Sequence, residues 1–367
     1  MSPRRNIHEL PTPVLLLDGP AARRNIAAAS ALAAQSSVRL RPHFKTHKCV
    51  PLAREQIRGG NCTGMTAATV DEAEALVEGG IDDVLIANQI VGPAKIVRLV
   101  RLARRAKIRA AIDSMANAEP IAAEAKRAGA TIGALLEIDI GHNRWGVAPD
   151  ESAVAMARQI SGLAGLRFDG LQAYHGSAGF LPGAEERDAY ARTTTEKAMT
   201  TRRLLEANGL PCSIVSGAGT GTFRAILNPT GMTELQLGTY VVMDWVFQER
   251  IGPLFEIALT VLASVISVSG DRFVIDVGIK GLGNKLGPPR FPELPGCEVT
   301  QYAAEEHTVA RAPGHGLSVG QQVRVIPSHA GGTANLYRQM IVHEDERVSE
   351  VWPISATGYD LEKGDPP

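Results

Sequence analysis

Residues 41–48 read Arg-Pro-His-Phe-Lys-Thr-His-Lys and connect a short apolar strand, which begins at Val38, to a helix that opens at Cys49. Lys45 therefore falls where a strand ends and a loop begins, which is where parallel α/β proteins place their catalytic groups. Two lysines, two histidines and one arginine within eight residues are a high density of basic side chains for such a position. The alternative interpretation, from composition alone, is a solvated basic loop.

An alternation of apolar strands and helical patterns extends outward from this stretch. A strand at 12–18 and a helix from 20 to about 34 come before it. The strands that alternate with helices are predicted at 40–44, 62–66, 84–87, 108–113, 134–139, 168–174, 213–216 and 234–237. Examples of the helices between them are 70–78, 93–105, 116–128, 151–161 and 184–208. A doubly wound sheet also alternates, but eight strands predict a parallel (β/α)8 TIM barrel.

The pattern changes near Asp244, after which the sequence is rich in short β runs. These runs are 258–269, 272–277, 299–302, 308–310, 322–326, 339–342 and 348–353. Turn signals such as Pro313-Gly314 separate them. The sequence therefore predicts a second, all-β domain after the barrel. The polar tail at 358–367 is expected to be disordered.

The composition limits the classes of function that this chain can have. Its 367 residues suit a large barrel plus a second domain, and 44% hydrophobic with 21% charged residues is ordinary for a globular protein. A net charge of −1 argues against nucleic acid as a partner, and no apolar run is long enough for a membrane span. The first eight residues lack the apolar core of a signal peptide. The four cysteines form no Cys-x-x-Cys pair, so we expect a cytoplasmic chain with free thiols.

Residues 41–48 closely resemble the Arg-Pro-His-x-Lys-Thr-His-Lys element of the D-threonine aldolase and D-serine dehydratase family. Members of this family are pyridoxal 5'-phosphate (PLP) enzymes with an alanine-racemase-type barrel, so the resemblance implies that Lys45 carries PLP as a Schiff base. The neighbouring cations Arg41 and Lys48 would favour the neutral amine. Analogy with this fold also places the N-terminal strand in the β domain. We therefore expect a barrel at 20–245 and a β domain formed by 1–19 and 246–367.

A glycine-rich segment, Ser-Gly-Ala-Gly-Thr-Gly-Thr at 216–222, follows the seventh predicted strand. Loops at this place in a barrel commonly bind phosphate, because their backbone N–H groups can turn toward an anion. The segment lacks the Gly-Lys-Ser/Thr ending of a nucleotide-binding loop, and a tight turn is the simpler interpretation. It is similar to the Gly-Gly-Gly-Thr-Gly-Thr phosphate loop of the same family, from which Ala218 departs. The resemblance implies that the cofactor is bound by Ser216, Gly219, Thr220 and Gly221.

Two further segments resemble cofactor-binding elements of the family. The segment 137–147 resembles Asp-x-Gly-x-x-Arg-x-Gly-Val, which implies that Arg144 approaches the phenolic oxygen of the cofactor and stabilises its charge. The segment 234–244 resembles Gln-x-Gly-x-Tyr-x-x-x-Asp, which implies that Gln236 and Tyr240 pack near the cofactor ring or its nitrogen. The sequence does not assign the partner of that nitrogen.

Tyr174-His175-Gly176 follows the sixth predicted strand. A histidine at the end of a barrel strand can reach the cofactor face, and imidazole suits proton transfer near neutral pH. A lone histidine is more often structural, but in aldolases of this family the matching residue lies near the substrate hydroxyl. The resemblance therefore implies that His175 is the catalytic base and that Tyr174 binds the cofactor.

The metal-site element of the family is incomplete in this chain. Residues 327–337 align with it, and in the family a histidine and the Asp or Cys two residues further on bind a divalent cation. His329 is present, but Gly331 occupies the second position, and one histidine rarely holds a metal. A divalent cation is therefore a doubtful second cofactor. Other conceivable ligands are Asp244, Glu306 and His307.

Because the resemblance covers nearly the whole chain, it implies a PLP-dependent lyase that cleaves D-configured β-hydroxy amino acids to glycine and an aldehyde. A dehydratase acting on D-serine or hydroxyaspartate, a metal-independent amino-acid racemase and a Schiff-base aldolase for a phosphosugar stay open. A non-catalytic PLP carrier also stays open, although such carriers lack a β domain. Relatives of this fold form head-to-tail homodimers, and we expect the same here.

Overall fold

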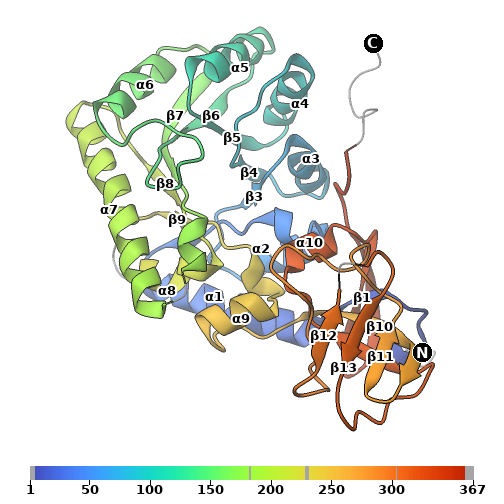
Figure 1. Ribbon diagram of the computed structural model, residues 1–367. Coiled ribbons are helices and arrows are strands. Elements are labelled where there is room, and N and C mark those ends of the chain that lie inside the picture. The colour runs from blue at the N-terminus through green and yellow to red at the C-terminus, as the bar shows by residue number, and fades with distance from the viewer. Residues whose placement is uncertain (1–4, 182, 228–230, 303, 360–367) are drawn as a thin grey trace. The chain divides into compact units, whose positions relative to one another are not determined.

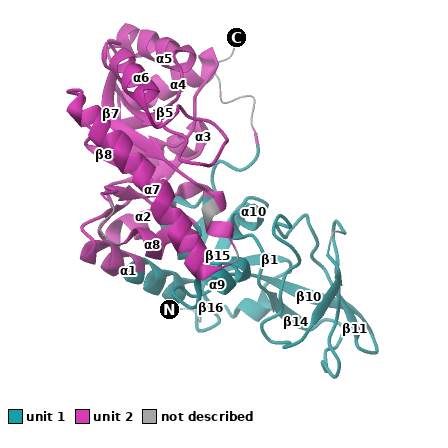
Figure 2. Cartoon of the chain, turned by 60° about the vertical axis from the view of Figure 1, so that its left-hand side comes forward, with its two compact units in different colours: residues 1–28, 46–52, 239–358 teal, residues 29–45, 53–238, 359–367 magenta. Residues whose placement is uncertain are grey.

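The structure is a computed structural model that describes residues 5–181, 183–227, 231–302 and 304–359 (Figure 1). Most of the tail for which we expected disorder, residues 360–367, lies outside the described residues. The chain forms two compact units (Figure 2). One unit comprises residues 1–28, 46–52 and 239–358, and the other comprises 29–45, 53–238 and 359–367. No helix among the described residues is long and apolar enough to cross a membrane.

The second of these units contains a parallel barrel. Its strands are β2 (Arg39–Leu40), β3 (Met65–Ala67), β4 (Asp83–Ile86), β5 (Lys107–Ile112), β6 (Ile132–Glu137), β7 (Leu166–Ala173), β8 (Ile214–Gly217) and β9 (Glu234–Leu235). They pair in the order β2-β9-β8-β7-β6-β5-β4-β3. Isolated parallel bridges from Leu40 to Cys62 and from His43 to Thr66 join the two ends of this order. The predicted eight-stranded parallel barrel is therefore confirmed.

Helices alternate with these strands because their apolar faces are periodic. The helices are α1 (Gly19–Gln35), α2 (Val50–Arg58), α3 (Val70–Glu78), α4 (Pro93–Ala103), α5 (Met115–Arg127), α6 (Glu151–Ser161), α7 (Ala184–Ala207) and α8 (Phe223–Ile226). Side chains cap the first turns of α3 and α6. In α3, Val70, Ala73 and Leu76 are buried, while the Thr69 side chain accepts a hydrogen bond from the backbone N–H of Glu72. All six residues of β6 are buried, as expected for a parallel strand covered on both faces.

The stretch around Lys45 differs from its predicted secondary structure. We expected a strand over residues 40–44, but β2 ends at Leu40 and Phe44–Thr46 form the short 3-10 helix η2. Pro42 has no N–H to donate, so a bond is lost on the β3 side, although the N–H groups of Arg41 and His43 still donate to the segment of β9. The Pro42 carbonyl also accepts from the backbone N–H of Thr66 at 2.8 Å. Lys45 is therefore presented by a helical turn just beyond the strand.

The other unit is built on a mixed β-sheet. Its path is β12 (Glu298–Gln301), β13 (Thr308–Arg311), β11 (Arg272–Ile275), β10 (Leu259–Ser269), β1 (Val14–Asp18), β15 (Gln339–Glu344) and β16 (Arg347–Pro353). β14 (Gln322–Val325) pairs with β10, and the short helices α9 (Trp245–Ile251) and α10 (Ala330–Ala334) also lie in this unit. β1 is antiparallel to β10 and parallel to β15, so the N-terminal strand lies inside the C-terminal sheet. A small core at this point contains Ile7, Leu16, Leu262 and Ile341.

Candidate active site

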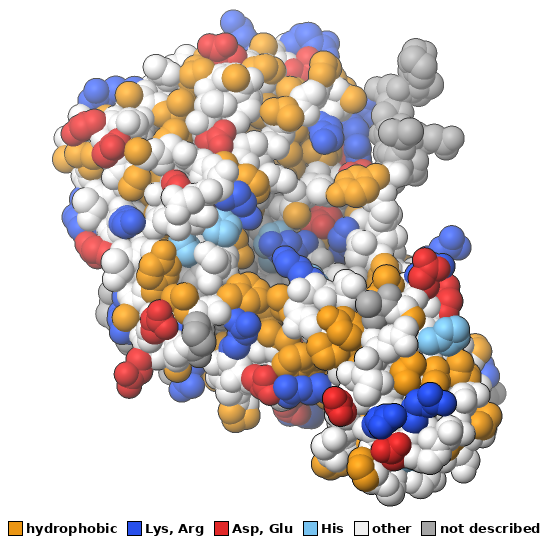
Figure 3. All heavy atoms as spheres, in the orientation of Figure 1, with side chains coloured by type: hydrophobic (Ala, Val, Ile, Leu, Met, Phe, Trp, Pro, Cys, Tyr) orange, Lys and Arg blue, Asp and Glu red, His pale blue; other side chains and the backbone are white. Residues whose placement is uncertain are grey.

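A pocket lies at the carboxyl ends of the barrel strands, and residues from several strands line it. Its lining includes Lys45, Asn88, Arg144, Gln172, Tyr174 and Gln236. On the face shown in Figure 3, histidine side chains gather beside lysine and arginine side chains. Four residues that the sequence singled out far apart in the chain are thus brought together, namely Lys45, Arg144, Tyr174 and Gln236.

Tyr174 forms an aromatic wall between two cations of the pocket. The Lys45 Nζ lies 5.7 Å from the centroid of the Tyr174 ring, and the Arg144 Cζ lies 5.6 Å from the same centroid. Arg144 also stacks on Trp145, with 3.6 Å between its Cζ and the indole centroid. Burial raises the pKa of the Tyr174 phenol, although Arg144 acts in the opposite direction. The wall therefore stays neutral beside the Lys45 amine and the Arg144 guanidinium, which suits a flat, anionic ligand.

Arg144 is held by a compact loop that its own backbone closes. A parallel bridge between Ile138 and Val147 joins the two ends of the loop. Inside it, the Asp139 Oδ1 accepts the backbone N–H groups of Gly141 at 2.9 Å and Asn143 at 3.1 Å. A Cβ on Gly146 would lie 2.9 Å from the Asp139 nitrogen, so only glycine allows the chain to return this closely. The closure of the loop therefore explains why the Arg-x-Gly-Val motif has glycine at this position.

Glu137, the last residue of β6, has an environment that the sequence did not reveal. It is 3% exposed, and burial raises its pKa to about 8 although Arg144 acts in the opposite direction. Near neutral pH the carboxyl is therefore mostly protonated and does not neutralise Arg144. The positive charge of Arg144 stays available to an anion in the pocket.

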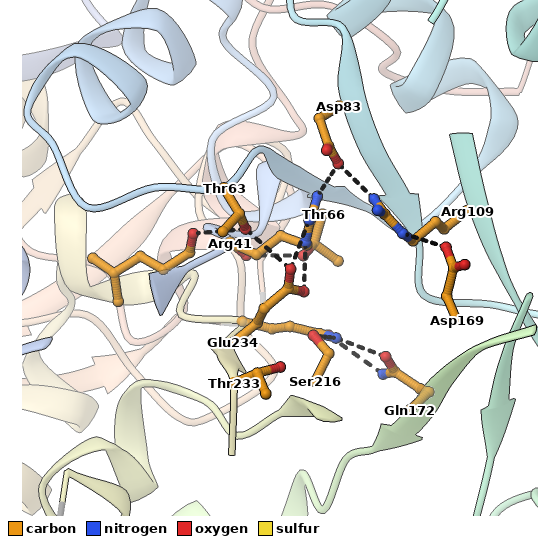
Figure 4. Close-up of polar contacts among 12 residues, drawn as sticks. Arg41, Thr63, Thr66, Asp83, Arg109, Asp169, Gln172, Ser216, Thr233 and Glu234 are labelled. Atoms are coloured by element: carbon orange, nitrogen blue, oxygen red, sulfur yellow. Dashed lines mark hydrogen bonds and ion pairs between the residues drawn. The ribbon is translucent and has the colours of Figure 1, made fainter. Parts of the chain in front are cut away.

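A neutral amide pair forms one side of the pocket (Figure 4). The Gln236 Nε2 donates to the Gln172 Oε1 at 2.7 Å and to the Ser216 Oγ at 2.9 Å, and all three residues are buried. Ser216, which we expected at the phosphate loop, thus holds a glutamine side chain. We did not predict Gln172, but its strand register beside Ser216 is the signal that could have identified it. No acidic residue lines the described part of this pocket.

The glycine-rich segment follows β8 as predicted. It contains the 3-10 helix η4 (Thr220–Thr222) and leads directly into α8. A Cβ on Gly221 would lie 2.7 Å from the Gly179 Cα, so the segment packs closely against another backbone there. A Cβ on Gly219 would meet nothing closer than the Tyr174 ring at 3.8 Å, which leaves open space beside the aromatic wall. An amine, an aromatic wall, a cation and this opening together fit PLP.

His175 is buried next to the wall, beside two rings that we did not predict. His142, from the loop closed by Ile138 and Val147, lies 5.4 Å from His175 between ring centroids. Tyr190, from the second turn of α7, lies 5.1 Å from His175. His142 occupies an unspecified position of the motif at 137–147 and Tyr190 lies outside the motifs, so only their spatial position identifies them.

Two of the residues considered as metal ligands, Asp244 and His329, take part in backbone hydrogen bonds in the other unit. The Asp244 Oδ1 accepts the N–H of Phe247 at 2.9 Å, and its Oδ2 accepts the N–H of Ala330 at 3.0 Å. Burial raises the pKa of Asp244 to about 6, against the effect of these backbone N–H groups. The His329 Nδ1 accepts the N–H of Gly332 at 3.1 Å at the start of α10. Within the described ranges, no group of three His, Cys, Asp or Glu side chains could hold a metal.

Three other predicted residues are placed as follows. Glu306 forms an ion pair with Lys280 at 2.9 Å. Tyr240 lies in the same unit as Glu306, and its ring centroid is 5.6 Å from that of Phe255. Arg41 is 1% exposed, and its guanidinium pairs with Glu234 and Asp83, each at 2.7 Å. The charge of Arg41 is therefore compensated inside the barrel.

The chain matches known protein families over most of its length. Residues 17–244 match the family model "Alanine racemase, N-terminal domain", and residues 258–343 match the serine dehydratase domain model. The chain is 38% identical to a D-threonine aldolase of an Arthrobacter species over 95% of this chain and 93% of the relative. It is 33% identical to a 3-hydroxy-D-aspartate aldolase of Paracoccus denitrificans, with the same two coverages.

A solved structure extends this similarity to the fold. The D-threonine aldolase from Filomicrobium marinum superposes with a TM-score of 0.92 at 35% identity. The superposition covers 96% of this chain and 98% of the solved one, so it includes both the barrel and the β-sheet unit.

Proposed function

Because this chain belongs to the family of D-threonine and 3-hydroxy-D-aspartate aldolases, we propose that it is a PLP-dependent lyase. Its substrates are D-configured β-hydroxy amino acids, and its products are glycine and an aldehyde. The observation that carries the proposal is the meeting of Lys45, Arg144, Tyr174 and Gln236 around one pocket. These are the residues to which the family resemblance gives cofactor-binding roles.

Each residue of the pocket has a task that matches its chemistry. PLP, when bound, withdraws electrons from the substrate α-carbon so that a bond at that carbon can break. Lys45 holds the cofactor, Arg144 compensates the charge of its phenolic oxygen, and the segment 217–222 holds its phosphate. Gln172 and Gln236 offer neutral amide contacts to the ring, since their side chains bond to each other and not to an ion.

His175 is the proposed base. Its imidazole takes the proton of the substrate β-hydroxyl while the Cα–Cβ bond breaks, and the hydroxyl-bearing fragment leaves as an aldehyde. The same imidazole, once protonated, can return a proton when glycine is completed. The residues considered for a cation do not fit a site with several ligands, so we assign no step to a metal.

The proposal is tested by spectroscopy and by products. Purified protein with PLP should absorb in the visible range, and borohydride should fix the label on Lys45 in a peptide map. D-threonine and D-3-hydroxyaspartate should each release glycine, whereas their L-isomers should not. Lys95→Ala, on the exposed surface of α4, is a matched control that should keep the absorbance and the products.

Three results would contradict the proposal. Label on Lys48 would show that the wrong lysine was chosen, and racemised substrate without glycine would show a racemase. Ammonia and a keto acid would show a dehydratase. A chelator should leave the rate unchanged; inhibition that manganese reverses would reveal a cation site that we have not assigned.

We further propose that the chain is a homodimer and is cytoplasmic. Relatives of this fold pair head to tail, and light scattering of the active protein would detect a monomer if this is wrong. The four cysteines, Cys49, Cys62, Cys212 and Cys297, are free thiols, which supports a reducing compartment. Localisation of a tagged chain in cell fractions tests this second point.

A further inference from the structure

His175 lies in a cluster of four rings. Its imidazole meets the Tyr190 ring edge-on, with 5.1 Å between centroids and a 71° angle, and meets the His142 ring at 5.4 Å and 59°. The His142 ring in turn meets Tyr174, the aromatic wall of the pocket, at 6.0 Å and 82°. The cluster therefore runs without interruption from the pocket wall to Tyr190, which is 39% exposed on α7.

One contact in this cluster is polar and specific. The Tyr190 hydroxyl lies 3.4 Å from the His175 Nε2. The backbone of the loop after β6 closes on the same place, because a Cβ on Gly141 would lie 3.4 Å from both of these atoms. Three separate segments thus converge on one nitrogen of the proposed base. A phenol can accept from a protonated Nε2 or donate to an unprotonated one, so this contact can hold the ring in one orientation in either protonation state.

The geometry points to Tyr190 as a positioning residue that orients the His175 imidazole through its Nε2, with His142 packing against the same ring. This inference rests on the proposed role of His175 as base. A base needs a third group that orients it, since a rotated ring or the wrong tautomer cannot take the substrate proton. Tyr190 acts only through His175 and need not touch substrate.

The surroundings of His175 include two rings and the charged groups next to them. The rings around it are those of Tyr190 from α7 and His142 from the loop after β6. Behind His142 lie Arg144 and Asp139. Burial lowers the pKa of His142, Arg144 and His175 lower it further, and Asp139 opposes them. His142 therefore stays neutral near pH 7 and places no fixed charge beside the base.

The test removes one oxygen atom. Tyr190→Phe keeps the ring contact and loses only the hydroxyl, while Tyr359→Phe, which alters a fully exposed tyrosine, is the matched control. We expect kcat for D-threonine cleavage to fall about tenfold in Tyr190→Phe, the effect of one lost hydrogen bond to a catalytic group, with KM within about twofold. The pH profile of kcat should move, and the visible absorbance with PLP should not, because the cofactor contacts are untouched.

A second measurement does not depend on turnover. Nitrogen-15 spectra of the imidazole groups, with the His175 signals assigned by their loss in His175→Asn, report the tautomer in protein without cofactor. The His175 signals should change in Tyr190→Phe and stay constant in Tyr359→Phe. Unchanged nitrogen signals, or a kcat equal to that of the unmodified chain at every pH, would overturn the inference. If the unmodified chain cleaves no β-hydroxy amino acid, the proposed function fails, while the spectra still decide whether the Tyr190 hydroxyl binds the His175 Nε2.

Discussion

Two neighbouring layers of side chains inside the barrel differ in how their charges are compensated. The lower layer is ionic: Arg41 pairs with Glu234 and Asp83, and Arg109 pairs with Asp83 and Asp169, all at 2.7–2.8 Å (Figure 4). The upper layer, around the pocket, contains the neutral pair of Gln172 and Gln236 and the cations Lys45 and Arg144. The change takes two residues along the chain, from Glu234 in β9 to Gln236 just after it.

The titration of acids in the two layers shows what this difference means. Burial opposes ionisation in both. In the lower layer the arginines overcome it and lower the pKa of Asp83 and of Glu234. In the upper layer burial wins and raises the pKa of Glu137 to about 8. Charges are thus matched with charges where the barrel needs stability, and cations keep their charge where an anion is to bind.

The largest expected effect separates activity from stability in the upper layer. Lys45→Ala should lower turnover by more than about 10⁴-fold, because the amine that holds the cofactor is lost. Its free energy of unfolding should change by less than about 1 kcal/mol, since Lys45 is exposed and surface substitutions change stability little. Kinetics and urea unfolding of the same preparation measure both quantities. A large loss of stability would place Lys45 with the structural layer and break the comparison.

The next prediction removes an ion-pair partner from the lower layer. Arg41→Met leaves the carboxylates of Glu234 and Asp83 buried without this partner, which costs about 3–5 kcal/mol. The exposed pair of Arg203 and Glu196 gives the control, because Arg203→Met should cost less than about 1 kcal/mol. Denaturant titration at one pH compares the two variants. Equal losses would show that the lower layer is not the source of stability that its ion pairs indicate.

The two layers should also limit stability at opposite ends of the pH scale. Glu137 has a raised pKa in the folded state, so its stability is present below about pH 4.5 and is lost as pH rises toward about 8. Glu137→Gln should remove about 2–3 kcal/mol of the decline in unfolding free energy between pH 6 and 8. Glu234 has a lowered pKa, so its stability is present at neutral pH and is lost as pH falls.

Unfolding curves of Glu137→Gln and Glu234→Gln across pH measure these two losses of stability, which form the neutral limb and the acid limb of the pH profile. Glu78→Gln, on the exposed side of α3, should leave both limbs unchanged. If Glu137→Gln changed only the acid limb, the carboxyl would be ionised in the fold and the upper layer would not be neutral.

The smallest expected effect concerns Ala218, at which the glycine-rich segment departs from the phosphate loop of the family. Ala218 has a φ of 62°, a conformation that costs a residue with a side chain about 1 kcal/mol. Ala218→Gly relieves that strain but removes a buried methyl worth about 0.8 kcal/mol, so stability should change by less than about 0.5 kcal/mol. PLP affinity from absorbance titration should stay within about threefold. A larger change in stability or in PLP affinity would show that the backbone conformation at Ala218 shapes the upper layer more than its hydrogen bonds indicate.

Local sequence patterns account for most of what could be predicted about this chain. The alternation of strands and helices gave the barrel because burial follows a period that neighbouring residues set themselves. α3 and α6 have the bounds predicted for them. Near Lys45 the local rule failed at Pro42, whose missing N–H ended the strand early. The glycine loop and the Arg144 loop were visible because their turns need glycine at fixed positions.

Only the tertiary structure decided which distant residues meet. Arg41 and Glu234 are 193 positions apart, and Gln172 and Gln236 are 64 apart, yet each pair is within hydrogen-bonding distance. Tyr190 and His142 gained their place beside His175 in the same way. No local pattern marks such partners, because a closed barrel sets the distance between two side chains by strand order and register and not by their separation along the chain. The sequence by itself therefore identified the residues that carry reactive groups, while closure of the barrel selected the neighbours that fix their charge, orientation and protonation.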